Sequence, residues 1–231
     1  MAPQEIAVYP DLTCTQNVAF FGAVYGLSRG ESLARAQACL DAVGLRDRAD
    51  SLVSELSGGM RRRLQLATAL VHEPPFLILD EPTVGLDLEI RQQVWDLING
   101  LRREGRSILL TTHHLEEAER LGTRIGIIDS GRIAVEGSMD ALRRHVDAEL
   151  LAVVESEDPD AVCRRAEELG ITFRRRADTT VLWLTEDMPI RSVVDTLGDV
   201  QLTSVRLKPV GLEEVFAEVL GRAEGVVAPR D

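Results

Sequence analysis

The stretch Phe76-Leu77-Ile78-Leu79-Asp80-Glu81-Pro82-Thr83 decides the fold of this chain. Four consecutive apolar residues are typical of a short strand that is buried on both faces of a sheet. Two carboxylates, Asp80 and Glu81, follow the apolar run directly. The stretch therefore predicts a buried strand with acidic side chains at its C-terminal end. Taken alone, the same pattern is also typical of a strand that ends in a solvated turn.

The region before this strand has helical spacing. One helix is expected from Leu12 to about Gly30, with Thr13 or Thr15 as its N-cap, and a second from about Ser32 to Val43. The turn Ser57-Gly58-Gly59 opens a third helix, because apolar residues follow it at i, i+4, i+7 and i+11, namely Met60, Leu64, Ala67 and Val71. Three successive arginines early on this helix are expected on its solvated face: Arg61, Arg62 and Arg63.

The region after the strand alternates between helix and strand. A helix with Ile90, Val94, Leu97 and Leu101 on one face precedes a strand from Ser107 to Thr111, and another helix begins near His114. This alternation predicts an α/β fold with a parallel sheet. A hairpin is expected where Asp129-Ser130-Gly131-Arg132 separates two apolar runs, because Gly131 can supply the positive φ of a tight turn.

Beyond about His145 the order of elements becomes β-α-β-β-α-β, which predicts a small α+β domain of ferredoxin-like topology followed by one more helix. We therefore expect a first α/β domain over residues 1–147, containing a helical subdomain at 10–72 and a strand-bearing part at 76–128. An accessory domain should cover residues 148–222, and a flexible tail residues 223–231.

Composition narrows the classes of function. The formal net charge of −12, with no basic stripe to offset it, argues against nucleic acid as a partner. No apolar run approaches the roughly 18 residues that cross a bilayer, and no secretory signal is visible, so we expect a cytoplasmic protein with no transmembrane segment of its own. The three cysteines, Cys14, Cys39 and Cys163, are expected to be packing thiols rather than a disulfide framework or a zinc cluster.

Three groups of residues could carry chemistry. Asp80 and Glu81 supply what phosphoryl transfer to water needs, since one carboxylate can hold Mg²⁺ and the second can orient or deprotonate the attacking water. Ser57-Gly58-Gly59 offers a hydroxyl and unhindered N–H groups for an anion, although a plain serine N-cap explains it too. His113 follows an apolar strand where ligands bind in parallel sheets, although a lone histidine there is more often a surface residue.

The order of these motifs is more specific than any one of them. A proline-glutamine pair, Leu-Ser-Gly-Gly, the strand with Asp-Glu-Pro-Thr, Gly-Leu-Asp and Thr-Thr-His followed by Glu-Glu-Ala-Glu occur in one series. This series resembles the ATP-binding-cassette (ABC) ATPases, from residue 3 through the last helix. The resemblance implies a RecA-like, P-loop NTPase-type sheet with a helical signature subdomain, ATP and Mg²⁺ as ligands, and ATP hydrolysis coupled to transport.

The resemblance also implies a role for each matching residue. Asp80 would be the Walker B ligand of Mg²⁺, Glu81 the general base and His113 the switch histidine that bonds the γ-phosphate. Gln4 would be the Q-loop glutamine that contacts the metal and the reactive water. The signature that binds a γ-phosphate would be Ser57, Gly58 and Gly59. The D-loop residue that crosses a dimer interface would be Asp87.

Departures from the family pattern are few. Met60 replaces the commoner glutamine of the signature, Leu88 replaces a frequent proline after the D-loop, and His114 stands where tyrosine is common, so it receives no role. The segment Leu212-Glu213-Glu214-Val215-Phe216 resembles the last helix of daunorubicin-type export ATPases. The resemblance thus implies a drug or lipid-like substrate, a transmembrane permease and a second ATPase subunit, with the chain on the inner face of the cell membrane.

One motif of the family is missing from these residues. A P-loop needs lysine before Ser or Thr after a glycine-rich turn, and the only lysine of the chain is Lys208. We expect an N-terminal truncation that removes the first strands of the sheet and leaves the strand Phe76 to Leu79 with an open apolar edge. The alternative is a non-hydrolysing partner subunit that supplies the signature in trans. A cassette of DNA repair or translation ranks last, because it predicts inserted coiled coil, zinc cysteines or a second cassette.

Overall fold

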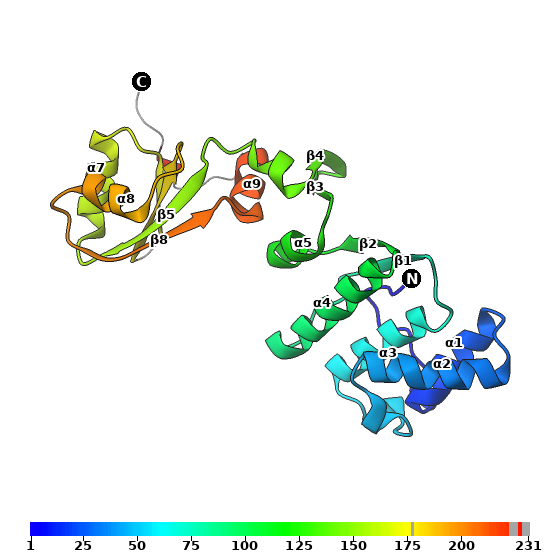
Figure 1. Cartoon of the computed structure of the whole chain (residues 1–231). Helices are drawn as coiled ribbons and strands as arrows, with labels where there is room; N and C mark the ends of the chain where they lie inside the picture. The colour runs from blue at the N-terminus through cyan, green and yellow to red at the C-terminus, as the bar shows by residue number, and fades with distance from the viewer. Residues whose placement is uncertain (177, 222–225, 228–231) are drawn as a thin grey trace. The chain divides into compact units, whose positions relative to one another are not determined.

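The computed structural model describes the backbone of residues 1–176, 178–221 and 226–227, and it divides into two compact units, Met1–Gly122 and Thr123–Asp231. The first unit opens with helices that are expected from the sequence (Figure 1). It contains α1 (Cys14–Val24), α2 (Arg29–Ala42), the short 3₁₀ turns η1 (Arg46–Arg48) and η2 (Val53–Glu55), α3 (Gly58–Leu70), β1 (Phe76–Asp80), α4 (Leu88–Arg103), β2 (Ser107–Thr111) and α5 (Leu115–Leu121).

Local side-chain hydrogen bonds determine where these helices begin. Thr13 and Gln16 form a capping box at the start of α1, and Ser28 and Glu31 form another at the start of α2. Ser57 accepts a hydrogen bond from the backbone N–H of Met60 and caps α3. The predicted helix starts are therefore confirmed within a few residues, because N-caps leave a clear local signal in the sequence.

β1 and β2 pair in parallel, with Phe76 opposite Ser107 and Asp80 opposite Thr111. The other edge of β1 is also bonded, because Ala2 donates to the carbonyl of Ile78 at 2.8 Å and accepts from the N–H of Asp80 at 3.0 Å. The expected open edge of β1 is therefore closed at this single bridge, and no described strand pairs along the rest of it. Both edges of β1 are bonded at this bridge, whereas β2 pairs with β1 on one edge only within the described residues.

The core of the first unit lies where α1, α2, α3 and α4 pack together and against β1. Side chains from these helices, including Leu40, Leu64 and Trp95, have no exposed surface, and Leu77 and Leu79 of β1 are buried beside them. β1 is less covered than predicted, because Phe76 is half exposed. Within the described residues no helix combines the length and the apolar character needed to cross a bilayer.

The second unit begins with the predicted hairpin. β3 (Ile125–Asp129) and β4 (Arg132–Gly137) pair antiparallel around a turn in which Ser130 and Gly131 both have positive φ, as a tight primed turn requires. The remaining elements are α6 (Met139–Arg143), β5 (Leu150–Ser156), α7 (Pro159–Glu168), β6 (Phe173–Arg176), β7 (Thr179–Leu184), α8 (Ile190–Leu197), β8 (Leu202–Pro209), α9 (Leu212–Val219) and β9 (Val226–Val227).

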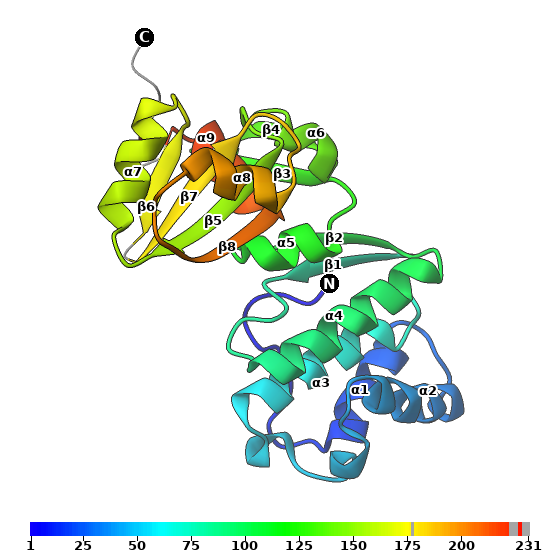
Figure 2. The ribbon, with the colours of Figure 1, turned by 60° about the vertical axis from the view of Figure 1, so that its left-hand side comes forward.

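Five of these strands form one antiparallel sheet in the order β8-β5-β7-β6-β9. Helices α7 and α8 pack on the sheet and against each other, as Figure 2 shows. Their buried residues, among them Val162, Ala166, Val193 and Leu197, join Leu182 of β7 in a separate core. The element order β-α-β-β-α-β is the predicted one.

The two units divide at Gly122/Thr123, ahead of the boundary that we place near residue 147 from the sequence. The hairpin and α6 belong with the later elements in space, because α6 contacts α9 and Arg143 Nε donates to the carbonyl of Val210 at 2.8 Å. The last stretch of the predicted tail, residues 228–231, and residues 223–225 lie outside the described residues.

Two leucines of α2 give a matched test of the first core. Leu40→Ala should lower the free energy of unfolding by about 2–5 kcal/mol, because Leu40 is fully buried and its removal leaves a cavity. Leu33→Ala on the exposed side of the same helix should change it by less than about 0.5 kcal/mol. Urea unfolding followed by far-UV circular dichroism measures both. Equal losses would contradict the packing of α2.

Candidate active site

The candidate site lies at the C-terminal ends of the two parallel strands. Because parallel strands end at the same edge of a sheet, the pairing of Asp80 with Thr111 brings the residues after β1 next to those after β2. Thr111 Oγ1 donates a hydrogen bond to Asp80 Oδ1, and the N–H of Glu81 donates to the carbonyl of Thr111 at 3.0 Å. The acidic pair is thus attached to the strand that leads to His113.

Glu81 and His113 are in direct contact. The distance from Glu81 Oε1 to His113 Nδ1 is 2.7 Å, so the carboxylate accepts a hydrogen bond from the imidazole. The Glu81 side chain is 15% exposed and the His113 side chain 66%, so the carboxylate is shielded while the ring faces solvent. The other carboxylate oxygen, Glu81 Oε2, is buried and has no hydrogen-bond partner among the described residues. A buried acceptor of this kind is usually satisfied by a ligand or an ordered water.

The backbone at Glu81 is strained. Its φ is +50°, a left-handed conformation that is uncommon for residues other than glycine. Such conformations cost about 1–3 kcal/mol and persist where the surrounding structure holds them. They also cluster at active sites, so the strain at Glu81 is a second reason to regard this turn as functional.

Arg62 holds this turn from the side of α3. The sequence interpretation placed it on a solvated face, and that interpretation is wrong, because Arg62 is 4% exposed and donates to the carbonyls of Asp80, Glu81 and Pro82. Helical periodicity could not reveal this, since Leu64 to Leu70 are also buried and α3 has little solvated face after its first turn. A buried arginine leaves no signal in a pattern that assigns charge to the surface.

Gln4 reaches the site through its backbone. Arg62 Nη1 donates to the carbonyls of Pro3 at 2.7 Å and Gln4 at 2.8 Å, so the segment that follows the Ala2 bridge is held beside β1. The side chain of Gln4 belongs to an exposed residue. The structure therefore brings together Asp80, Glu81, His113 and the main chain of Gln4.

Ser57, Gly58 and Gly59 form the N-terminal turn of α3. The hydroxyl of Ser57 caps the helix by accepting from Met60 N at 3.3 Å, which is the plain structural role considered from the sequence. Ser57 and Gly58 are exposed, and a Cβ added to Gly58 would meet open space. A Cβ at Gly59 would lie 3.2 Å from Leu86 Cδ2, so glycine there permits close packing of the loop before α4.

Asp87 lies at the start of α4. Gly85 before it has φ +75°, and Leu86 between them is buried. Asp87 Oδ1 accepts from the N–H of Ile90 at 2.9 Å, so the carboxylate caps α4 while the residue stays exposed. Ser57 and Gly58, like Asp87, are thus exposed at helix starts and lie outside the Glu81–His113 contact.

Glu117 is a buried residue that the sequence analysis missed. Its Oε1 accepts hydrogen bonds from Thr83 Oγ1 at 2.8 Å and from Trp95 Nε1 at 2.9 Å, and its Oε2 is buried without a partner. The guanidinium of Arg120 lies 5.0 Å from the centre of the Trp95 ring. Thr83 follows Glu81 by two residues, and Glu117 follows His113 by four. The Glu117 carboxylate therefore connects the segment after β1 and the segment after β2 to Trp95 of α4.

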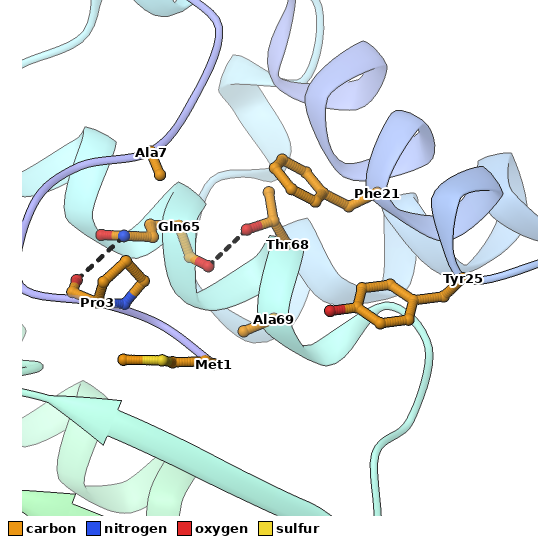
Figure 3. A pocket seen from close by; sticks show the side chains of 8 residues that line it. All are labelled: Met1, Pro3, Ala7, Phe21, Tyr25, Gln65, Thr68 and Ala69. Atoms are coloured by element: carbon orange, nitrogen blue, oxygen red, sulfur yellow. Dashed lines mark hydrogen bonds between the residues drawn. The ribbon is translucent and has the colours of Figure 1, made fainter.

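A pocket lies away from these groups. Figure 3 shows it between the N-terminal segment, α1 and α3, where Gln65 Nε2 donates to the Pro3 carbonyl at 3.1 Å and Thr68 Oγ1 donates to the Gln65 carbonyl at 2.8 Å. Its lining is Met1, Pro3, Ala7, Phe21, Tyr25, Gln65, Thr68 and Ala69. Asp80, Glu81 and His113 are not part of this lining.

The acidic pair has a donor set that fits Mg²⁺. This ion is usually held by one or two carboxylates together with waters and the phosphates of a substrate. Asp80 keeps a second oxygen beyond the one bonded to Thr111, and Glu81 Oε2 is unpartnered. Within the described residues no cluster of three or more His, Cys, Asp or Glu forms a metal site by protein ligands alone. Asp80 would therefore hold the ion together with phosphate oxygens.

Comparison with known proteins places the chain in a family. Residues 1–84 match the model of the ABC transporter family. The Nod factor export ATP-binding protein I of Paraburkholderia xenovorans (strain LB400) is 37% identical over 225 residues, which cover 96% of this chain and 72% of that protein. The daunorubicin/doxorubicin resistance ATP-binding protein of Streptomyces peucetius is 36% identical over 226 residues, covering 94% and 68%.

Solved structures agree with this placement. An ATP-binding subunit of an ABC transporter has a TM-score of 0.56 at 32% identity, covering 62% of this chain and 60% of that one. A dimeric ATP-binding cassette in a post-hydrolysis state with ADP and Pi has a TM-score of 0.55 at 27% identity, covering 59% and 61%. The chain spans about three fifths of these solved chains.

Glu117 can be tested through the tryptophan that it binds. Glu117→Ala should lower the free energy of unfolding by about 2–4 kcal/mol, because it leaves the Trp95 N–H and the Thr83 hydroxyl buried without an acceptor. Glu117→Gln keeps an acceptor oxygen and should cost less than half as much. Exposed Glu116→Ala is the control. In a Trp183→Phe background, Trp95 emission should shift only in Glu117→Ala; an unchanged emission there would exclude the hydrogen bond.

Proposed function

The chain belongs to the ABC transporter family of ATP-binding proteins, and from this we propose that it is the ATP-binding and ATP-hydrolysing subunit of an ABC-type membrane exporter. The observation that carries the proposal is the 2.7 Å contact of Glu81 with His113 beside Asp80, at the C-terminal end of a parallel strand pair. The export direction rests on two of the relatives, a Nod factor export protein and a drug resistance protein.

Glu81 is the proposed general base. Its Oε2 has no hydrogen-bond partner among the described residues, so it can accept a proton from a water that is bound against it. The hydrogen bond from His113 and the N–H bond from Glu81 to the Thr111 carbonyl orient the carboxylate. When bound at Asp80, Mg²⁺ would neutralise phosphate charge, and Gln4 would contact the ion and the water.

His113 is the proposed ligand of the γ-phosphate. Its ring is largely exposed, so the imidazole can meet a phosphate oxygen from solvent. An imidazolium donates from both nitrogens, whereas a neutral ring donates from one only. A protonated His113 can therefore bond Glu81 through Nδ1 and a phosphate oxygen through Nε2 at the same time.

Ser57, Gly58 and Gly59 are proposed to bind the nucleotide of a facing cassette, with Asp87 at the interface. What supports this is that Ser57 and Gly58 are exposed and that Gly58 has open space around it, so backbone N–H groups can approach phosphate oxygens. The likeness to a dimeric cassette with ADP and Pi is consistent with a two-cassette arrangement. A second ATPase subunit and a membrane permease are thus the proposed partners, with the chain on the cytoplasmic side of the membrane.

Residues 148–222 are proposed to be an accessory domain of ferredoxin-like topology. The strand order β8-β5-β7-β6 with antiparallel pairing throughout is the order of a split β-α-β arrangement, and it supports this assignment. The transported substrate, a drug or lipid-like molecule by analogy, would be selected by the permease.

A second candidate is a non-hydrolysing subunit that supplies Ser57 to Gly59 in trans. It is favoured by the sequence context of the single lysine, because Lys208 follows no glycine-rich turn and binds Glu214 at 3.1 Å. In that arrangement Glu81 would take no part in hydrolysis.

The two candidates differ in which residue hydrolysis requires. In the assembled exporter that contains this chain, Glu81→Gln should lower kcat for ATP hydrolysis at least about a hundredfold, because the water loses its base, with KM changed less than about threefold. Glu116→Gln is the matched control on an exposed site. Steady-state phosphate release measures both.

Ser57→Arg discriminates further, with exposed Ser54→Arg as its control. Loss of hydrolysis in Ser57→Arg but not in Glu81→Gln would establish the second candidate. Normal hydrolysis in both variants would exclude both candidates.

A further inference from the structure

Arg62 is the most deeply buried cation of the first unit, and its contacts extend in two directions. Toward the N-terminal segment, Nη1 donates to the carbonyls of Pro3 at 2.7 Å and Gln4 at 2.8 Å, and to Gln65 Oε1 at 3.0 Å. These bonds attach the segment that carries Gln4 to the second turn of α3.

Toward the strand, the same guanidinium reaches the turn after β1. Nη2 donates to the carbonyl of Asp80 at 2.6 Å and to that of Glu81, and Nε donates to the carbonyl of Pro82 at 3.3 Å. These three carbonyls belong to the strained turn that aims the Glu81 carboxylate. One side chain therefore binds three elements: α3, the Gln4 segment and the β1 turn.

The chemistry of the side chain explains why it is arginine. A guanidinium presents five N–H donors in a rigid planar fork, whereas a lysine has three donors at one point. Burial of the charge lowers the pKa of Arg62 below its ordinary value, and the carboxylates of Asp80, Glu81 and Glu117 partly offset this lowering. Because its acceptors lie on both sides of the fork, an ammonium at this position cannot reach all of them.

The neighbouring arginines bind other elements. Arg61 donates to the carbonyls of Val53 and Ser54 in η2, and Arg63 donates to those of Val43 and Gly44 after α2. Gln65 Nε2 donates to Pro3 and Glu5, so it holds the N-terminal segment and not the strand. These three residues are natural controls for Arg62.

We propose that Arg62 is a positioning residue that makes the first turns of α3, the Gln4 segment and the Asp80–Glu81 turn move as one unit. On the proposed function, Ser57 to Gly59 contact a nucleotide on a facing cassette, whereas Gln4, Asp80 and Glu81 act on a nucleotide of this cassette. Arg62 lies one turn after Gly59 and bonds the backbone of the other three residues. It therefore transmits a displacement at one nucleotide site to the other.

Backbone dynamics of the full chain test the coupling without nucleotide. In Arg62→Lys, amide order parameters should fall from about 0.85 to below about 0.6 in both segments together, at Gln4 and Glu5 and at Glu81, Thr83 and Val84. Gln65→Met should lower them in the first segment only. Arg61→Lys and Arg63→Lys should leave both segments unchanged. Residue-resolved ¹⁵N relaxation is the measurement.

The outcomes separate positioning from a general loss of stability. Arg62→Gln is measured in parallel. The proposal requires lower order parameters in both segments of whichever variant keeps the native spectrum of α1 and α2. Loosening of one segment only, a uniform loss of order across the first unit, or unfolding of both variants would overturn the proposal. Each of these results would make Arg62 an ordinary structural residue.

A kinetic measurement tests whether the positioning by Arg62 matters for ATP hydrolysis. In the assembled exporter, Arg62→Lys should lower kcat at least about tenfold with KM changed less than about threefold, because nucleotide contacts remain while the base is misaligned. Arg61→Lys should keep the wild-type kcat. An unchanged kcat in Arg62→Lys would overturn the functional part of the proposal. The relaxation measurement is made without nucleotide, so its result on the coupling of the two segments remains valid even if the proposed ATPase function is wrong.

Discussion

The parallel pairing of β1 with β2 is the constraint on which the site depends. With Asp80 opposite Thr111, both strands end at one edge, and the residues that follow them must meet there. Glu81 and His113 are far apart in the sequence, yet their side chains are 2.7 Å apart. A shift of one residue in this register would separate the carboxylate from the imidazole, so the apolar side chains that set the register, such as Leu77 and Leu79, also support the chemistry.

Two buried ionic side chains then hold the turn after β1. Arg62 bonds its carbonyls from α3, and Glu117 bonds Thr83 from α5 while also accepting from Trp95. The positive φ of Glu81 needs such support, because without these contacts the backbone would relax to a more favourable conformation. These hydrogen bonds therefore stabilise the fold and also hold the strained backbone that positions the Glu81 carboxylate.

Local patterns predicted much of this arrangement. The caps at Thr13 and Ser57, the strand Ser107–Thr111 and the hairpin turn at Gly131 all depend on neighbours in the sequence, and the structure agrees with each. The solvated-face interpretation failed for Arg62 because the acceptors of its side chain come from distant segments. Arg62 alone takes acceptors from residues near position 3 and near position 80, which helical periodicity cannot indicate.

The sequence by itself determined the family, the order of the elements and the identity of Asp80, Glu81 and His113 as one candidate set, because ordered motifs and local periodicity are properties of the chain. The tertiary structure alone decided that Ala2 borders β1, that Glu81 Oε2 is left without a partner, and that Arg62 and Glu117 are buried at the site. The physical reason is that burial and hydrogen bonding between distant segments depend on packing, and packing is a property of the folded chain.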